Sequence, residues 1–297
     1  MYRQMLNGTP LMLPADEAGR NEMRRLVLPL FGVEELILGY SMRHRPIYMY
    51  KFGKGRGRVA FFGAHHALES ITANVLYAFV YILNSEKRRV AFDKDVPSLF
   101  LSMYTYYVIP CLNPDGIEIR FNGDVRSPLY RRVLEISGGD LSGWQANARG
   151  VDLNHNYDYR FAEYKRIESR LGIVAGPTKY SGEYPESEPE SRLAANLVRV
   201  LYPDAVASLH SQGGEIFFSP REAVRPATVL SRRTGYRISY PSDTAAYGGL
   251  CDYTGNVLGI PSFTIEIGRG KNPLPESDIP NILESLTNAL LVLPGTV

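Results

Sequence analysis

Two adjacent histidines and a glutamate lie together in the segment GAHHALES, as His65, His66 and Glu69. The chain has five histidines, at positions 44, 65, 66, 155 and 210, so a metal or acid–base site must draw on a short list. A histidine and a glutamate three residues apart at the start of a helix project side by side and can bind one cation. Spacing alone leaves both His65 and His66 open as the histidine ligand.

A third ligand could come from His210, which ends a separate apolar segment, DAVASLH. Two histidines and one glutamate would leave a fourth position open for water, which is typical of catalytic zinc sites, whereas structural zinc sites are normally closed. An HxxE pattern by itself often occurs by chance. The HExxH, GxSxG and GxxxxGK signatures of other catalytic sites are absent from the sequence.

The segments around these residues alternate between strand and helix patterns. Strands are predicted in ELILGYSMRHRPIYMYKFG, RVAFFGA, YTYYVIPCL, DAVASLH and PSFTIEIG, and helices near EAGRNEMRRLVLPL, ESITANVLYAFVYILN, EPESRLAANLVRVL and DIPNILESLTNALLVL. This alternation predicts an α/β fold with an open, twisted, mixed but mainly parallel sheet and helices on both faces. His66, Asn113, His210 and Glu266 follow or end separate strands, so we expect them at one edge of the sheet.

Charge and cysteine content exclude several classes of protein. The formal net charge is +2, from 33 Lys and Arg against 31 Asp and Glu, which argues against a nucleic-acid partner. Two cysteines, Cys111 and Cys251, cannot build a disulfide framework and lack the CxxC spacing of a cysteine zinc site. The sequence has no recognisable leader or membrane-length apolar run, so we expect a cytoplasmic protein without a membrane partner.

Six motifs follow one another along most of the chain: GAHHALES, IPCLNPDG, ARGVDLNHNYD, SLHSQGG, AYGGLCDY and SFTIEIG. Through them the sequence resembles the zinc metallocarboxypeptidase (funnelin) family. The resemblance implies the metallocarboxypeptidase fold and one zinc ion bound by His66, Glu69 and His210, which leaves His65 as a neighbour. Glu266 matches the general base, which takes a proton from the attacking water and delivers it to the leaving amine. Residues 1–297 would form a single zinc peptidase catalytic domain, with 1–36 as a helical lead-in packed on it.

Other matched positions are expected to contact the substrate. Arg149 is the candidate for stabilising the oxyanion of the transition state, with Arg131 and Arg132 as alternatives. Asn154 matches an asparagine that helps to hold a substrate carboxylate. Ordinary members have an arginine at the next position, where its fork clamps the free C-terminus of a peptide, whereas this chain has His155. Strict recognition of a C-terminus is therefore not expected.

The AYGGLCDY motif contains the remaining candidates. The family's mobile tyrosine would align with Thr244, so Tyr247 can serve only if the loop shifts. Cys251 and Asp252 match positions that line the pocket for the residue after the scissile bond. All three are expected to bind substrate.

The segments VDLNHNYD and GPTKYSGEYPESEPES are similar to bacterial γ-D-glutamyl-diaminopimelate peptidases of this family. The similarity implies a peptide or muropeptide substrate, cut between γ-D-glutamate and meso-diaminopimelate of peptidoglycan stem peptides, and a role in cell-wall recycling. The alternatives are a carboxypeptidase that releases C-terminal L-amino acids, a zinc deacylase of N-acyl amino acids, and a non-catalytic binding module. The last is disfavoured because all three ligands and the glutamate base are present. Nothing in the sequence specifies an oligomeric state.

Overall fold

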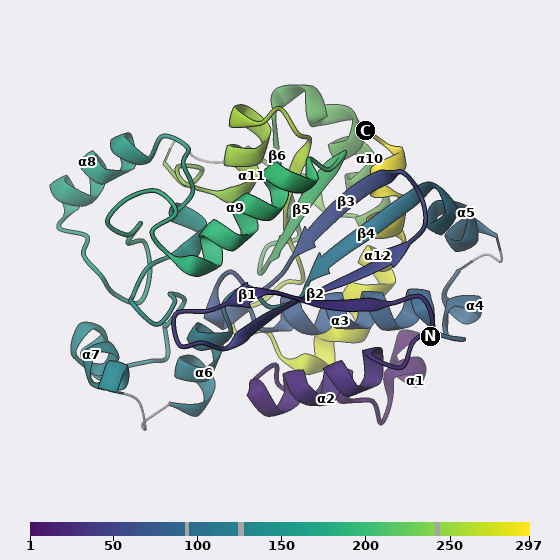
Figure 1. Cartoon of the computed structure of the whole chain (residues 1–297), viewed down its shortest axis with the longest axis horizontal. Coiled ribbons are helices and arrows are strands. Elements are labelled where there is room, and N and C mark those ends of the chain that lie inside the picture. The colour runs from purple at the N-terminus through teal and green to yellow at the C-terminus, as the bar shows by residue number, and fades with distance from the viewer. Residues whose placement is uncertain (93–94, 124–127, 241–243) are drawn as a thin grey trace.

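A computed structural model of the chain describes residues 1–92, 95–123, 128–240 and 244–297 (Figure 1). Within these residues, eight strands form one sheet in the order β1-β2-β4-β3-β5-β8-β6-β7. The strands are β1 (Glu34–Tyr40), β2 (Pro46–Gly53), β3 (Gly57–Phe62), β4 (Tyr104–Ile109), β5 (Ala205–His210), β6 (Glu215–Ser219), β7 (Arg237–Ile238) and β8 (Ser262–Glu266).

The sheet is mixed, as predicted, with a parallel centre. Strands β4, β3, β5 and β8 run parallel to one another. Strands β1 and β2 form an antiparallel extension on one side, and β6 pairs antiparallel with β8 on the other. The carboxyl ends of the central parallel strands therefore meet at one edge of the sheet, where sites of open α/β folds are found.

Helices cover both faces of the sheet. The helices of the described residues are α1 (Tyr2–Leu6), α2 (Glu17–Val27), α3 (Ile71–Asn84), α4 (Arg88–Ala91), α5 (Val96–Met103), α6 (Pro114–Asn122), α7 (Pro128–Ser137), α8 (Phe161–Leu171), α9 (Pro189–Leu201), α10 (Val224–Thr234), α11 (Leu250–Asp252) and α12 (Ile279–Val292). Helices α3, α10 and α12 pack on one face, whereas α9 and α11 contribute to a separate hydrophobic cluster on the other.

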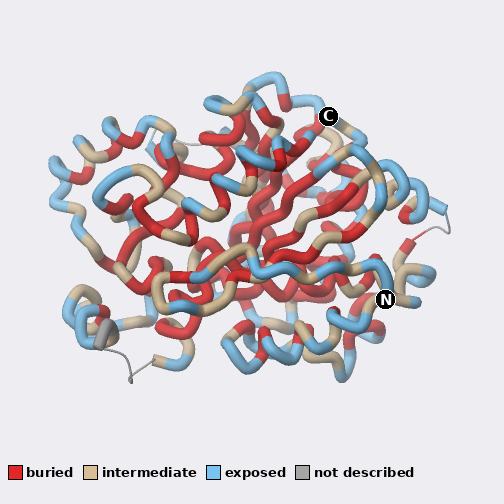
Figure 2. Tube along the Cα trace, in the orientation of Figure 1, coloured by how far each residue is buried: buried red, intermediate tan, exposed pale blue. Residues whose placement is uncertain are grey.

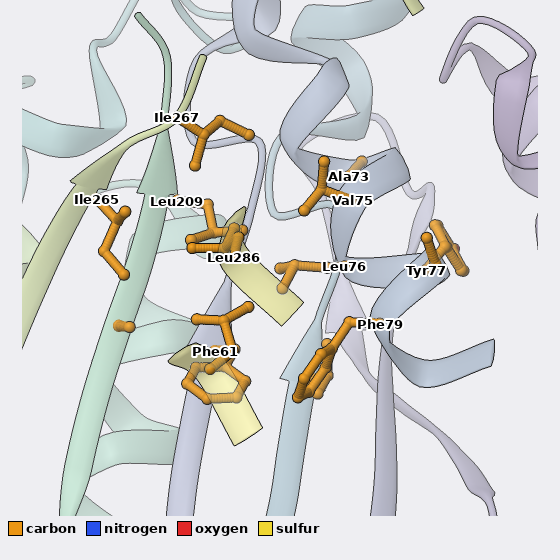
Figure 3. Close-up of a cluster of buried hydrophobic side chains, with 14 of the residues drawn as sticks. Phe61, Ala73, Val75, Leu76, Tyr77, Phe79, Leu209, Ile265, Ile267 and Leu286 are labelled. Carbon is orange, nitrogen blue, oxygen red and sulfur yellow. The ribbon is translucent and has the colours of Figure 1, made fainter. Parts of the chain in front are cut away.

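Alternation along the strands divides the core between these two faces. Phe61, Leu209 and Ile265 of three neighbouring strands belong to one buried cluster with Leu76 of α3 and Leu286 of α12 (Figure 3). The neighbours of Phe61 along β3, residues 60 and 62, belong instead to the cluster that includes α9. Burying a large apolar side chain contributes about 1.5–3 kcal/mol, so this two-sided burial holds the central strands rigidly. Figure 2 shows these strands as almost continuously buried.

Helix α3 is more apolar than a surface helix. The sequence was expected to contain no apolar stretch of membrane-spanning length, but residues 67–84 are long and apolar enough, by length and composition, to cross a membrane. In the structure, 89% of this stretch is buried inside the protein. Its packing against α2 and α12 explains the composition, because a helix enclosed on several sides needs apolar residues all round.

The N-terminal segment packs on the same layer. Helix α1 contacts α12, and α2 contacts α3. The predicted helical lead-in ends earlier than expected, because β1 already begins at Glu34. Helix α2 begins at a capped end, where the carboxylate of Asp16 accepts a hydrogen bond from the backbone N–H of Gly19 at 2.8 Å.

Candidate active site

The predicted site residues come from the carboxyl ends of three central strands. His66 lies shortly after β3, and a 3₁₀ turn (Ala67–Glu69) presents Glu69 before α3 begins. His210 ends β5 and Glu266 ends β8, and the two residues are paired in the register of these strands. The segments that follow or end β3, β5 and β8 therefore meet at the carboxyl edge of the parallel strands.

Asn113, which follows β4, supports this site from behind. Its buried side chain caps α6 by accepting a hydrogen bond from the N–H of Gly116 at 2.9 Å. The same amide donates to the carbonyl of His65 at 3.0 Å. It therefore fixes the loop that carries His66 and does not itself reach the ligand cluster.

His66, Glu69 and His210 form a cluster that could hold a metal ion. One ligand atom from each lies within 4.8 Å of the other two, in the part of the chain that the structure describes. Nδ1 of His66 is 3.0 Å from Oε1 of Glu69, and Nδ1 of His210 is 3.0 Å from Oε2 of Glu69. His65, the rival candidate, is not in this cluster.

The donor set fits zinc. Two imidazole nitrogens and a carboxylate oxygen are typical of catalytic zinc sites. Oε2 of Glu69 is buried and makes no properly oriented hydrogen bond to any described residue, although His210 Nδ1 is close by. A buried oxygen without a donor is costly, and a bound cation would satisfy it. Burial raises the pKa of Glu69, but the neighbouring imidazoles of His66 and His210 outweigh this effect and lower the pKa to about 2, so this ligand is ionised.

Asp152 holds His66 from its other side, a role that the sequence did not reveal. Nε2 of His66 lies 3.0 Å from Oδ1 of Asp152. Asp152 Oδ2 accepts the backbone N–H of Lys179 at 3.0 Å. Although Asp152 is buried, His66 lowers the pKa of this carboxyl well below its usual range. A carboxylate behind a ligating histidine fixes the ring orientation and leaves Nδ1 to face the metal.

Glu266, the predicted general base, lies on the strand next to His210 and is paired with it in the strand register. Burial, and next the charge of Glu69, raise the pKa of the Glu266 carboxyl well above its ordinary value. A bound cation beside Glu69 would oppose this rise. The side chain also lines a cavity of about 530 Å³, so a ligand in this cavity would reach it.

Three other predicted substrate residues also line this cavity, namely Asn154, Cys251 and Asp252. Oδ1 of Asn154 accepts the N–H of Leu250 at 3.2 Å. Burial raises the pKa of Asp252 to about 7, and burial also raises that of Cys251. Neither cysteine is in a disulfide.

His155 is packed beside this cavity by contacts of its own. Its Nδ1 donates a hydrogen bond to the carbonyl of Tyr247 at 2.7 Å, and its ring stacks on Tyr164 with centroids 4.3 Å apart. Gly248 allows the approach, since a Cβ there would lie 2.1 Å from the carbonyl oxygen of His155. Tyr247 is itself buried, with the guanidinium of Arg160 4.2 Å from its ring centroid.

The arginine candidates have carboxylate neighbours. Nη2 of Arg149 is 3.9 Å from Glu183, and its Nε is 3.8 Å from the buried Glu188. Arg131 and Arg132 are exposed on α7, where Arg132 lies 3.6 Å from Glu135. Within the described ranges, none of the three has a contact with the ligand cluster, so the oxyanion role of Arg149 stays a prediction.

The fold and the histidine–glutamate cluster together define a zinc metallopeptidase. Residues 33–228, more than half of the chain, match the zinc carboxypeptidase family, and the chain therefore belongs to this family. Its resident cofactor is zinc, and the cluster described above could bind it.

Individual proteins are similar to this chain in sequence or in fold. The chain is 28% identical over 282 residues to gamma-D-glutamyl-L-diamino acid endopeptidase 1 of Lysinibacillus sphaericus, covering 91% of this chain and 69% of that protein. Its fold resembles that of thrombin activatable fibrinolysis inhibitor (TM-score 0.72, 20% identity, 99% of this chain and 79% of that one). It also resembles murein-tripeptide amidase MpaA from Escherichia coli O157 (TM-score 0.56, 19% identity, 88% and 92%). At these identities the solved structures support the fold alone.

Proposed function

We propose that this zinc peptidase hydrolyses the amide bond between γ-D-glutamate and meso-diaminopimelate in peptidoglycan stem peptides. The observation that carries the proposal is His155, an imidazole held by Tyr247 and Tyr164 where the resemblance places a carboxylate-clamping arginine. An imidazole has no bidentate fork, so a free peptide C-terminus is not the expected anchor. The name of the Lysinibacillus relative, which refers to γ-D-glutamyl-L-diamino acids, supports the same substrate.

His66, Glu69 and His210 would hold the zinc ion. When bound, zinc lowers the pKa of a water molecule and polarises the scissile carbonyl. Asp152 keeps the His66 ring oriented through its Nε2. Glu266 accepts a proton from the attacking water and then donates it to the nitrogen of the leaving diamino acid.

Two further side chains bind the reacting groups in this proposal. Asn154 accepts the N–H of Leu250 with its oxygen, which leaves its amide N–H₂ to donate to a substrate carboxylate in the cavity. Arg149 supplies a cation toward the oxygen on which negative charge develops. Cys251 and Asp252 line the cavity where the leaving residue would sit.

The test is incubation of the zinc-loaded protein with two peptide sets, followed by mass spectrometry. One set contains L-Ala-γ-D-Glu-meso-diaminopimelate, and the other contains N-blocked peptides that end in ordinary L-amino acids. We expect release of diaminopimelate from the first set. Cleavage of the second set alone would replace the proposal with an ordinary carboxypeptidase activity, and release of the blocking acyl group alone would indicate a deacylase.

A further inference from the structure

Four polar residues lie in one row across the sheet. His210 on β5 pairs with Glu266 on β8, Glu266 pairs with Glu215 on β6, and Glu215 pairs with Arg237 on β7. Residues directly paired on neighbouring strands have their side chains on the same face. The row therefore runs from a candidate metal ligand, through the candidate base, to a charged pair of residues that the proposed reaction does not use.

The cavity of about 530 Å³ lies over three members of this row, Glu266, Glu215 and Arg237. Its floor is formed by alternate residues along three strands: Glu215 and Phe217 on β6, Arg237 on β7 with Ser239 directly after it, and Thr264 and Glu266 on β8. Such period-two lining means that one face of the sheet is the floor. Asn154 and the turn that contains Ala245, Ala246 and Gly249 form its walls.

The spacing of the strands sets the distance between the Arg237–Glu215 pair and Glu266. Neighbouring strands are about 4.8 Å apart, so the backbone of Arg237, two strands away, lies about 10 Å from that of Glu266. The fully extended side chain of diaminopimelate places its far carboxylate about 6–7 Å from the first α-carbon. A diaminopimelate bound beside Glu266 would therefore extend along the floor to within reach of the Arg237 guanidinium.

Both signs of charge are present at that end of the cavity. Nη2 of Arg237 donates to Oε1 of Glu215, and the guanidinium has further N–H donors for a second carboxylate. The Arg237 side chain is 72% exposed and that of Glu215 is 18% exposed, so a ligand in the open cavity can approach the arginine. A carbon that bears an ammonium and a carboxylate would complement the two residues together.

Resting on the proposed function, we propose that Arg237 and Glu215 bind the far end of diaminopimelate, the arginine through its carboxylate and the glutamate through its ammonium. The pair thereby selects substrates in which the residue after the scissile bond is a diamino acid with a free far carboxylate. Lysine has the same chain and the far ammonium but lacks this carboxylate. It would leave the arginine without its ligand.

The test compares L-Ala-γ-D-Glu-meso-diaminopimelate with L-Ala-γ-D-Glu-L-Lys, using wild-type protein, Arg237→Gln and the control Arg232→Gln. Arg232 is exposed on α10. Because Arg237 is largely exposed, we expect a preference of about tenfold in kcat/KM for diaminopimelate, below the effect of a fully buried contact. Arg237→Gln should reduce this ratio to near one, Arg237→Lys should retain part of it, and Arg232→Gln should leave it unchanged.

The outcomes separate this inference from the function on which it rests. If the wild-type protein cleaves neither tripeptide, the proposed function fails and the inference fails with it. If both are cleaved but equally well, or if Arg237→Gln keeps the wild-type ratio, only the inference is wrong. A third substrate with the far amine acetylated tests Glu215, because this substrate should be cleaved more slowly than the free amine. Equal rates would remove Glu215 from the proposal.

Discussion

His65 and His210 are joined through a single hydroxyl group. The Oγ of Ser208 lies 3.1 Å from Nε2 of His210 and 3.1 Å from Nδ1 of His65, and Nε2 of His65 lies 2.9 Å from the hydroxyl of Tyr157. If Nδ1 of His210 faces the metal, its Nε2–H must donate to Ser208. The serine hydroxyl then donates to His65, whose remaining N–H donates to Tyr157. Once Nδ1 of His210 is taken as the metal ligand, the donor and the acceptor of each of these three hydrogen bonds are fixed.

We therefore expect Ser208→Ala to weaken zinc binding about tenfold, because the ring orientation of His210 loses its partner. Competition with a chelator, followed by a metal-sensitive dye, measures the affinity. Ser231→Ala is the control, since that hydroxyl bonds to the carbonyl of Tyr236 on the opposite layer. Equal affinities of Ser208→Ala and wild type would show that the serine is not a positioning residue.

The two adjacent histidines should differ in their effect on the metal. His66→Ala removes a ligand of the cluster and should abolish stoichiometric zinc, measured by elemental analysis of the purified protein. His65→Ala should keep one zinc per chain, because His65 contacts His210 through Ser208 and by ring stacking but is not itself in the ligand cluster. The reverse pattern would move the ligand assignment to His65.

Much of this arrangement could be predicted from the sequence, because periodicity is strongest in long buried elements. The stretches that became α3, β3 and β5 are mostly apolar, and the motif residues next to them fall at one edge of the sheet. Asp152 could not be found in this way. A single aspartate has no periodic signal, and its contact with His66 spans 86 residues of sequence.

The part of the cavity formed by β6 and β7 was also not predicted. Strand β6, with the sequence EIFFS, has three consecutive apolar residues in place of an alternating pattern, and β7 has only two residues, too few to show one. Glu215 and Arg237 read as ordinary surface charges until strand register aligns them with Glu266. Tertiary pairing, which no local pattern encodes, is what makes them candidates for substrate recognition.

Glu266→Gln should separate metal binding from turnover. Glutamine keeps the size and the hydrogen-bonding oxygen of the side chain but cannot accept the proton of water, so kcat should fall by roughly 10²–10⁴-fold. Zinc content should stay at the wild-type level, since Glu266 lies outside the ligand cluster. A variant with unchanged kcat would exclude Glu266 as the base.

Arg149→Gln tests the oxyanion assignment. A cation that acts mainly in the transition state should lower kcat about 100-fold while KM changes little. Arg131→Gln and Arg132→Gln are matched controls, because both arginines are exposed on α7. If one of them lowers kcat while Arg149→Gln does not, the role belongs to that arginine, and Arg149 serves only its contacts with Glu183 and Glu188.

The buried carboxyl group of Glu190 should make the free energy of unfolding depend on pH, independently of the catalytic site. Burial raises the pKa of this carboxyl to about 8 from an ordinary 4.5, although it accepts the backbone N–H of Met42 at 3.0 Å. Between these values the folded protein keeps a proton that the unfolded chain has released. Folding then takes up a proton, so this group costs increasing stability as the pH rises from about 5 to 8.

Glu190→Gln should remove this dependence, because glutamine keeps the acceptor oxygen and never ionises. Relative to wild type, the variant should gain roughly 1–3 kcal/mol in free energy of unfolding between pH 5 and pH 8, measured by urea denaturation. Glu222→Gln, at an exposed position, should follow the wild-type curve. Parallel curves for wild type and Glu190→Gln would mean that Glu190 is ionised in the folded protein, with the amide of Asn147, 3.3 Å away, supporting its charge.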